Sequence, residues 1–216
     1  IEYQKKTALQ GVIEAVDRLG RTIKLGTHYA MMLNSREDIT SIIKNISLQE
    51  GIEHIRIFNK EGQIKFSNVA TEVDHTTNIK DDACFICHRT EPPLEEVDLV
   101  DRTRIIGDTD EGGRLLGIIS PIYNEPGCAS SCHVHPEDKK VLGALDVVVS
   151  LRSTDEQIVS YQTRLIGLAI LIFLGTAAII AAFLFVFIKR PINRLVSWMR
   201  LIGQGHYDQE SRIDSQ

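Results

Sequence analysis

Two cysteines and a histidine in the stretch Cys84-Phe85-Ile86-Cys87-His88 have the clearest chemistry in this chain. Two cysteines separated by two residues, with a histidine directly after the second, show the spacing for attachment of a c-type haem. Each thiol can add to one haem vinyl group, and the adjacent imidazole then binds the iron as proximal ligand. The spacing predicts haem c at this stretch. Half of a zinc site and a short redox disulfide are the alternatives for the two cysteines.

A second cluster, CASSCH at 128–133, has the same residue types with one more residue between its cysteines. It predicts a second covalent haem at Cys128 and Cys132, with His133 as the proximal ligand. The alternative is a disulfide between these two cysteines, which an oxidising compartment would permit. His135 follows closely, and the run Cys-His-Val-His also resembles a short metal-binding tract.

The remaining histidines supply candidates for a sixth iron ligand, and we rank His135 first, followed by His28 and His75. His28 lies near the end of the expected first helix, so iron ligation there would connect haem chemistry directly to helix position. His75 precedes Cys84 by nine residues and could fold back over the first haem.

A long uncharged segment at 165–188 divides the chain into three parts. About 20 apolar residues in a helix cross the hydrocarbon core of a bilayer, so we predict a transmembrane helix at 164–188. The charged residues that follow it are basic until Asp208, and positive charge marks the cytoplasmic side. We therefore expect residues 1–163 to form a periplasmic domain and residues 189–216 to be cytoplasmic.

We expect the membrane to be a bacterial inner membrane. The charge balance agrees with this placement. The whole chain has a formal net charge of −5, and the acidic excess lies in the part before the membrane segment. An acidic surface argues against nucleic acid as a partner. Covalent haem c is normally attached outside the bacterial cytoplasm. Because the first residue is Ile1, we expect the N-terminus to be truncated or processed, with a first membrane span missing.

Hydrophobic periodicity predicts an α+β domain, with two helices followed by an antiparallel sheet. The expected helices cover 1–33 and a segment from Ser35 to Gly51, in which Ser35 and Asp38 resemble a capping box. The expected strands are at 52–58, 63–68, 102–106, 114–122 and 141–151. In the last strand, apolar residues alternate with mostly smaller or polar ones, so one face is expected to be buried. The connections 69–101 and 123–140 are long, and each carries one Cys-Cys-His cluster.

The first helix has an apolar seam in a 3-4-3-4 spacing, formed by Leu9, Val12, Val16, Leu19 and Ile23. Such a seam fits either a dimer interface or a helix packed on its own domain. We expect a homodimer through this helix and the segment after the membrane.

The stretch KRPINRLVSWMRLIGQGHYD at 189–208 resembles the first helix of a HAMP linker. The preceding order of two helices, a hairpin and further strands resembles a Cache or PAS-like periplasmic sensor domain. Together with CFICH, the chain resembles the haem-c sensor region of bacterial transmembrane histidine kinases and chemoreceptors. The resemblance implies a dimeric receptor that signals to a cytoplasmic output. This stretch carries no catalytic domain, so enzymatic activity, such as that of a histidine kinase, would belong to the output.

Residues and resemblance together predict a haem-based redox or gas sensor, with a diatomic gas or a redox partner as its signal. The main alternative is a membrane-anchored dihaem c-type cytochrome that transfers electrons in the periplasm. A third interpretation is a Cache domain for a small organic ligand, in which haem is only structural.

Overall fold

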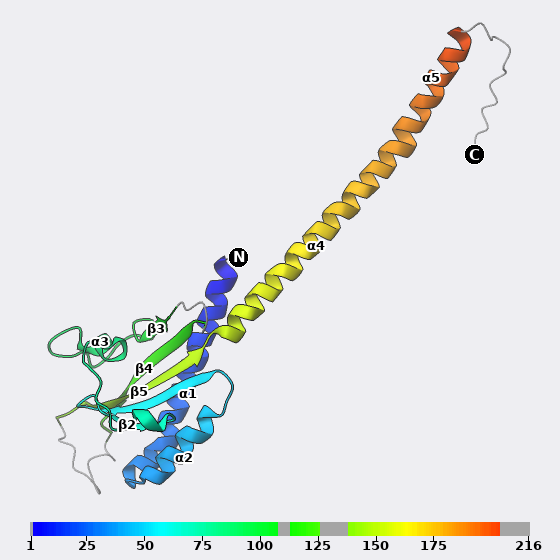
Figure 1. The fold of residues 1–216 in the computed structure, drawn as a ribbon. Coiled ribbons are helices and arrows are strands. Elements are labelled where there is room, and N and C mark those ends of the chain that lie inside the picture. The colour runs from blue at the N-terminus through cyan, green and yellow to red at the C-terminus, as the bar shows by residue number, and fades with distance from the viewer. Residues whose placement is uncertain (1, 108–112, 126–137, 204–216) are drawn as a thin grey trace. The chain divides into compact units, whose positions relative to one another are not determined.

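Two antiparallel helices begin the domain and lie on the same face of a sheet (Figure 1). The computed structural model describes residues 2–107, 113–125 and 138–203. Helix α1 runs over Glu2–Met32 and helix α2 over Arg36–Ser47. The turn between them contains Asn34 in the left-handed region, with φ 52°. The Ser35 side chain caps α2 by accepting a hydrogen bond from the backbone N–H of Asp38, as the sequence predicted.

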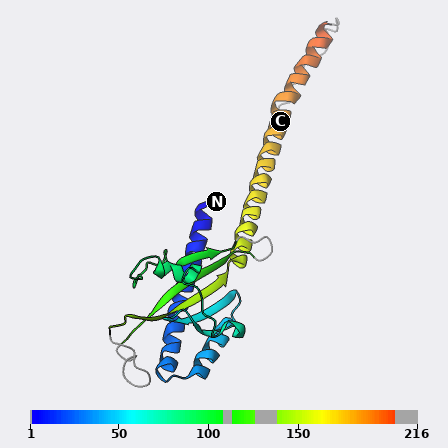
Figure 2. The ribbon, with the colours of Figure 1, turned by 60° about the vertical axis from the view of Figure 1, so that its left-hand side comes forward.

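The sheet has five antiparallel strands in the order β2-β1-β5-β4-β3 (Figures 1 and 2). The strands are β1 (Ile52–Asn59), β2 (Ile64–Ser67), β3 (Thr103–Ile106), β4 (Leu115–Tyr123) and β5 (Val141–Ser150). Gly62, with φ 77°, makes the tight turn of the β1–β2 hairpin. The predicted α+β class and the five strands are confirmed, with strand boundaries that differ by at most one residue.

The face of the sheet under α1 and α2 holds the hydrophobic core. Alternate residues of the strands point towards the helices, so Ile55 and Ile57 of β1 and Leu145 of β5 meet the apolar stripes of the helices. Ile23 of α1 and Ile43 of α2 are completely buried there. This packing is the reason that two amphipathic helices and a sheet form one domain.

The apolar seam of α1 packs within its own domain. Val16 and Ile23 are buried in the core, and the remaining seam residues, Leu9, Val12 and Leu19, pack against that core half-buried. Of the two interpretations of the seam, packing on the same domain is the one that the structure shows. Dimerisation stays a prediction, because the structure holds a single chain.

The connection between β2 and β3 covers the other face of the sheet and is more ordered than the sequence suggested. It contains a short 3-10 helix, η1 (Ala70–Glu72), and an α-helix, α3 (Asp82–His88). Arg102, at the end of this connection, donates a hydrogen bond of 3.0 Å to the buried Asp17 of α1. The connection is therefore anchored to the first helix as well as to the sheet.

The last strand continues almost directly into a long helix. Only Leu151, itself buried, separates β5 from α4 (Arg152–Leu184). Arg114, just before β4, forms an ion pair with Asp155 in the first turn of α4. The start of the helix is thus fastened to two neighbouring strands.

Beyond α4 the helical path continues through a π-helical turn, η2 (Phe185–Lys189), into α5 (Arg190–Gly203). In η2 the N–H of Arg190 donates to the carbonyl of Phe185, five residues earlier. Pro191 follows and has no N–H to donate, which favours such a local change of hydrogen-bond register. Among the described residues, the one helical run long and apolar enough to cross a membrane is Arg152–Arg200. The chain divides into the units 1–159 and 160–216, and the domain boundaries expected from the sequence stay predictions.

Candidate cofactor and ligand site

Helix α3 presents the predicted haem-attachment residues on one side. Cys84, Cys87 and His88 have the spacing i, i+3 and i+4, which places them on one helical face. Both cysteines are half-buried free thiols, whereas His88 is exposed. Burial raises the pKa of the Cys87 thiol. This donor set fits a covalently attached haem, because two thiols one turn apart stand beside an imidazole that can turn towards an iron.

Local contacts join α3 to the segments that precede and follow it. The Sγ atom of Cys84 lies 3.4 Å from Oγ1 of Thr77, within hydrogen-bond distance. The helix begins after Asp81, whose carbonyl accepts from the backbone N–H groups of Cys84 and Phe85. At its end, the N–H of Leu94 donates to the carbonyl of Cys87. Among the described residues, no three His, Cys, Asp or Glu side chains gather as a ready-made metal-ion site.

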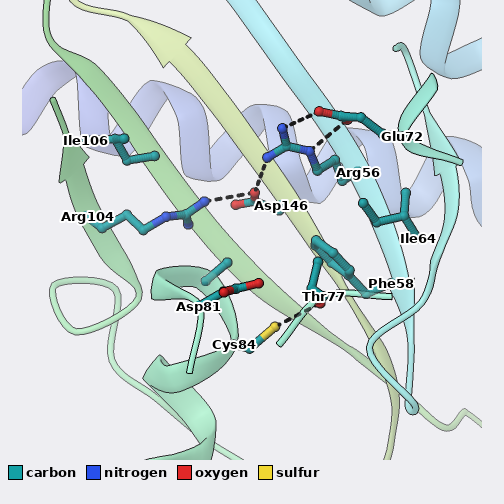
Figure 3. A pocket seen from close by; sticks show the side chains of 11 residues that line it. Arg56, Phe58, Ile64, Glu72, Thr77, Asp81, Cys84, Arg104, Ile106 and Asp146 are labelled. Carbon is teal, nitrogen blue, oxygen red and sulfur yellow. Dashed lines mark hydrogen bonds and ion pairs between the residues drawn. The ribbon is translucent and has the colours of Figure 1, made fainter. Parts of the chain in front are cut away.

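A pocket of about 310 Å³ lies between α3 and the sheet (Figure 3). Its floor is formed by charged side chains from three strands: Arg56 of β1, Asp146 of β5 and Arg104 of β3. The remaining lining residues are Phe58, Ile64, Glu72, Thr77, Asp81, Ala83, Cys84 and Ile106. The pocket therefore lies between α3, with its Cys84 side chain, and the charged residues of the sheet.

Asp146 is the centre of the floor and is completely buried. Nη2 of Arg104 donates to its Oδ2 atom over 2.8 Å, and Nη1 of Arg56 lies 3.6 Å from the same oxygen. A buried carboxylate is tolerated only when it is paired in this way. The guanidinium of Arg104 reaches Asp146 by lying directly over Gly117 of β4, where an added Cβ would come within 2.7 Å of Cζ.

Arg56 connects this floor to a second carboxylate, Glu72. The guanidinium binds Glu72 through two hydrogen bonds, and Ser67 donates a third to the same carboxylate over 2.8 Å. The hydrogen bonds from Arg56 are the main reason that the pKa of Glu72 is lowered to about 2. The same contact raises the pKa of Arg56. His54 lies next to this pair, with Nδ1 at 3.3 Å from Oε1 of Glu72.

Two atoms of the floor have no hydrogen-bond partner among the described residues although both are buried. They are Nη1 of Arg104 and Oδ1 of Asp146. The two groups share one hydrogen bond, where an Arg–carboxylate pair can form two. Both atoms are closed off from solvent, so the floor contains one buried donor and one buried acceptor without a partner among the described residues.

Of the predicted sixth ligands, His75 and His28 lie in different parts of the domain, and His135 lies outside the described residues. His75 is exposed, and its carbonyl accepts from Ile64 of β2; Thr77, two residues later, contacts Cys84. His28 lies on α1 with Nε2 at 4.0 Å from Oε2 of Glu125. The second cluster falls outside the described residues with all its predicted ligands, namely Cys128, Cys132, His133 and His135.

Sequence reasoning missed the charged floor. One signal was present, since Asp146 stands alone in the otherwise uncharged strand VLGALDVVVS. A charge in the middle of a buried strand needs a partner. Its partners, Arg56 and Arg104, are far away in the sequence, and nothing in their own strands marks them as such.

No protein-family model matches the chain, and no curated protein matches its sequence. Among solved structures, the sensor domain of DcuS from Escherichia coli is similar, with 13% sequence identity and a TM-score of 0.44. The alignment covers 70% of this chain and 98% of that domain.

Proposed function

We propose that this chain is the sensing and membrane part of a transmembrane signalling protein. Its sensing group is a haem c attached at Cys84 and Cys87, with His88 as the proximal ligand. When bound, the haem supplies a reversible change of charge and axial ligation. A second haem at 128–133 and a sixth ligand from His135, His28 or His75 are part of the proposal.

The connection from the pocket to the membrane helix is the observation that carries this proposal. Asp146, at the pocket floor, lies on β5, and β5 passes into α4 through the single residue Leu151. Antiparallel pairing with β1 and β4 holds β5 along its length. A change of charge in the pocket therefore acts on a strand that is mechanically continuous with the long apolar helix.

A change of charge in the pocket can affect the rest of the domain through two sets of contacts. Charge at α3 alters the balance among Asp146, Arg56 and Arg104, which ties three strands together. Movement of the connection is also transmitted to α1 through Arg102 and Asp17. A signal of this kind needs two states whose relative energy depends on the bound group.

The described helix beyond the membrane segment suits a signalling output. Ile192, Leu195 and Met199 of α5 are exposed and lie on one side at spacings of three and four. We propose that this seam pairs with a second copy in a HAMP-like bundle and passes the signal to a cytoplasmic output. A plain membrane anchor for an electron carrier would not need an apolar seam beyond the membrane.

Attachment of the haem is tested by a pyridine haemochrome assay on the full chain and on the Cys84→Ala/Cys87→Ala variant. We expect the variant to lose one haem per chain. An unchanged ratio of haem to protein would contradict the assignment of this haem to Cys84 and Cys87.

Signalling is tested separately, in lipid nanodiscs, with a trifluoromethyl label on α4 at Gln157→Cys and ¹⁹F NMR. We expect the label to shift between ferric and ferrous protein. A label at Glu61→Cys, in the β1–β2 hairpin, should not respond. Two glycines inserted between Leu151 and Arg152 should abolish the response at 157. If the α4 label is silent while the haem titrates normally, haem-based signalling is wrong, and an electron carrier or a structural haem remains.

A further inference from the structure

Three cationic side chains surround the buried carboxylate of Asp17, where α1 meets the end of the β2–β3 connection. They are Arg21 and Lys24 of α1 and Arg102 of the connection. Nη2 of Arg102 binds Oδ1 of Asp17, and Nη2 of Arg21 binds Oδ2, each over 3.0 Å. Both carboxylate oxygens are therefore engaged by arginines. We call these four residues the Asp17 cluster, in which three positive charges share one negative charge.

Lys24 is the cation of this cluster that is left without a carboxylate. Its half-buried side chain reaches β4, where Nζ donates to the carbonyl of Pro121 over 3.2 Å. Arg102 donates to Oγ of the neighbouring Ser120 over 2.7 Å, so adjacent residues of one strand hold both cations. Within the part of the chain that the structure describes, Lys24 forms no ion pair.

The surroundings of Lys24 disfavour its ammonium form. Burial lowers the pKa of Lys24, and the positive charge of Arg102 lowers it further. Asp17 acts in the opposite direction, and Arg21 adds to the lowering. More of Lys24 is therefore the neutral amine than is usual for a surface lysine, and the neutral amine is the form that can act as a nucleophile.

The nearest outer charges do not remove this imbalance. Glu125 makes the smallest contribution to the pKa of Lys24, and its carboxylate is largely exposed, at 4.0 Å from Nε2 of His28. An exposed carboxylate is screened by solvent and compensates a half-buried cation poorly. The cluster therefore favours a group that brings negative charge to Lys24 itself.

We propose that carbon dioxide carboxylates Lys24 at Nζ. The lone pair of the neutral amine forms a bond to the carbon atom, and one C=O bonding pair moves onto oxygen. The nitrogen then releases one proton to solvent. The product is a carbamate, and nothing is oxidised or reduced. The side chain changes from one positive to one negative charge.

The carbamate restores the charge balance of the Asp17 cluster. Two arginines then face two carboxylate groups. Among the described residues, Nε of Arg102 and both Nε and Nη1 of Arg21 make no hydrogen bond, so donors remain for the new oxygens. The positive charges that disfavour the ammonium of Lys24 are the ones that favour a carbamate.

Carboxylation would act on the contact between α1 and the β2–β3 connection. A carbamate beside Arg102 competes with Asp17 for the guanidinium. The backbone N–H of Arg102 donates to the carbonyl of Asp98, and that of Thr103 donates to Val100. We expect these turns to open more often once Lys24 is modified. The inference goes beyond the proposed function and rests on it only for the use of this change as a signal.

The test exposes the full chain in lipid nanodiscs to ¹³C-labelled carbon dioxide and bicarbonate at constant pH and ionic strength. Triethyloxonium ion converts a carbamate into a stable ethyl ester, which tryptic digestion and mass spectrometry locate. Trypsin does not cleave after a modified lysine, so the carboxylated chain yields the peptide 22–36 uncut at Lys24. We expect this ¹³C-labelled peptide to increase with carbon dioxide until it saturates. Lys44, exposed on α2, is the internal comparison and should stay unmodified.

Arg21→Gln tests the role of the charge cluster. It removes one charge that favours the neutral amine and the carbamate, so the trapped fraction should fall about two- to fivefold, the range of an exposed charge pair. The matched control is Arg18→Gln, at an arginine of α1 that is 63% exposed, against 64% for Arg21, and pairs with Glu14. This variant should keep the trapped fraction of the parent. Lys24→Arg keeps the positive charge and should abolish trapping, with an unchanged circular dichroism spectrum.

Hydrogen exchange follows the consequence for the connection. Carbon dioxide should accelerate exchange of the amides in 98–103 in the parent and not in Lys24→Arg. Trapped carbamate with unchanged exchange would contradict the effect on the connection and leave the modification standing.

Three results would overturn the modification itself. They are trapping at Lys24 no greater than at Lys44, an equal trapped fraction in Arg21→Gln, and calorimetric binding of bicarbonate without a trapped ester, which would mean that the cluster holds a free anion. The Cys84→Ala/Cys87→Ala variant should trap carbamate like its parent. Failure of haem attachment therefore contradicts the proposed function alone.

Discussion

The two faces of the sheet use the same strands and are stabilised in different ways. Leu145 and Asp146 are neighbours on β5, and both are completely buried. Leu145 belongs to the apolar core under α1 and α2, whereas Asp146 lies at the charged floor under α3. The helix face is closed by close-packed aliphatic side chains, with the part-buried ion pair of Asp17 and Arg102 beside them.

In the function proposed above, this difference separates stabilising the fold from responding to a bound group. Aliphatic packing stabilises the fold without depending on charge or pH. The pocket face depends on pairs of charges whose energies change when a group in the pocket gains or loses charge. The proposed function therefore requires the pocket face to respond to a bound group while the packing on the helix face keeps the domain folded.

The largest expected effect comes from removing the charge at the centre of the pocket face. Asp146→Ala leaves Arg104 in a buried site without its carboxylate, which should destabilise the protein by about 3–5 kcal/mol. Chemical denaturation in detergent, followed by far-UV circular dichroism, measures this difference.

The double variant Arg104→Met/Asp146→Leu is the control for this first prediction. Replacing a buried ion pair by apolar residues of similar size is often neutral or stabilising, so most of the lost stability should return. If the double variant is as unstable as Asp146→Ala, the pair contributes through shape rather than charge, and the two faces are less different than proposed.

A cavity on the helix face should have the next largest effect. Ile43 of α2 is fully buried in the core, so Ile43→Ala should cost on the order of 3 kcal/mol in the free energy of unfolding. Ile106, half-buried at the pocket wall, is the matched position on the other face, and Ile106→Ala should cost less than half as much. Equal losses at the two positions would show that the pocket is closed as tightly as the core.

The pocket face should also respond to acid through Glu72. Its pKa is lowered to about 2 by the hydrogen bonds from Arg56. The ionised form therefore contributes stability that is fully present above pH 4.5 and is lost as the pH falls towards 2. After allowance for partial exposure of the ion pair, we expect a loss of about 1–2 kcal/mol over this range. The pH profile of Glu72→Gln should be flatter than that of the wild type, and identical profiles would contradict the assignment.

The elements that form the helix face could be predicted from the sequence because their apolar residues recur at regular intervals. The spacing of apolar residues in 1–33 and the alternation in 141–151 correspond to α1 and β5. Ser35 and Gly62 marked a helix start and a hairpin turn through local chemistry, which a single sequence shows directly.

The pocket face could be predicted only in part. The spacing of CFICH marked Cys84 and Cys87, but it did not show that Cys84 lines a pocket with Asp146. The expected burial of one face of the strand 141–151 is confirmed by Leu145 and Val147, but the sequence did not indicate that Asp146 and Val148 are buried on the second face as well. That burial comes from a connection of irregular structure, whose path depends on contacts between residues far apart in the sequence.

The smallest expected effect compares the helices that cover the two faces. Ser35 caps α2 through the N–H of Asp38, so Ser35→Ala should cost about 1 kcal/mol. At the start of α3, the Asp81 side chain makes no cap hydrogen bond and accepts instead from the N–H of Asn78. Asp81→Ala should therefore change stability by less than half as much, by the same denaturation measurement. Hydrogen exchange supplies a second comparison, because amides of the uncapped and shorter α3 should exchange faster than those of α2. Slower exchange in α3 than in α2 would mean that the cover of the pocket is as firmly held as the core helices, and the pocket face would then not be the responsive one.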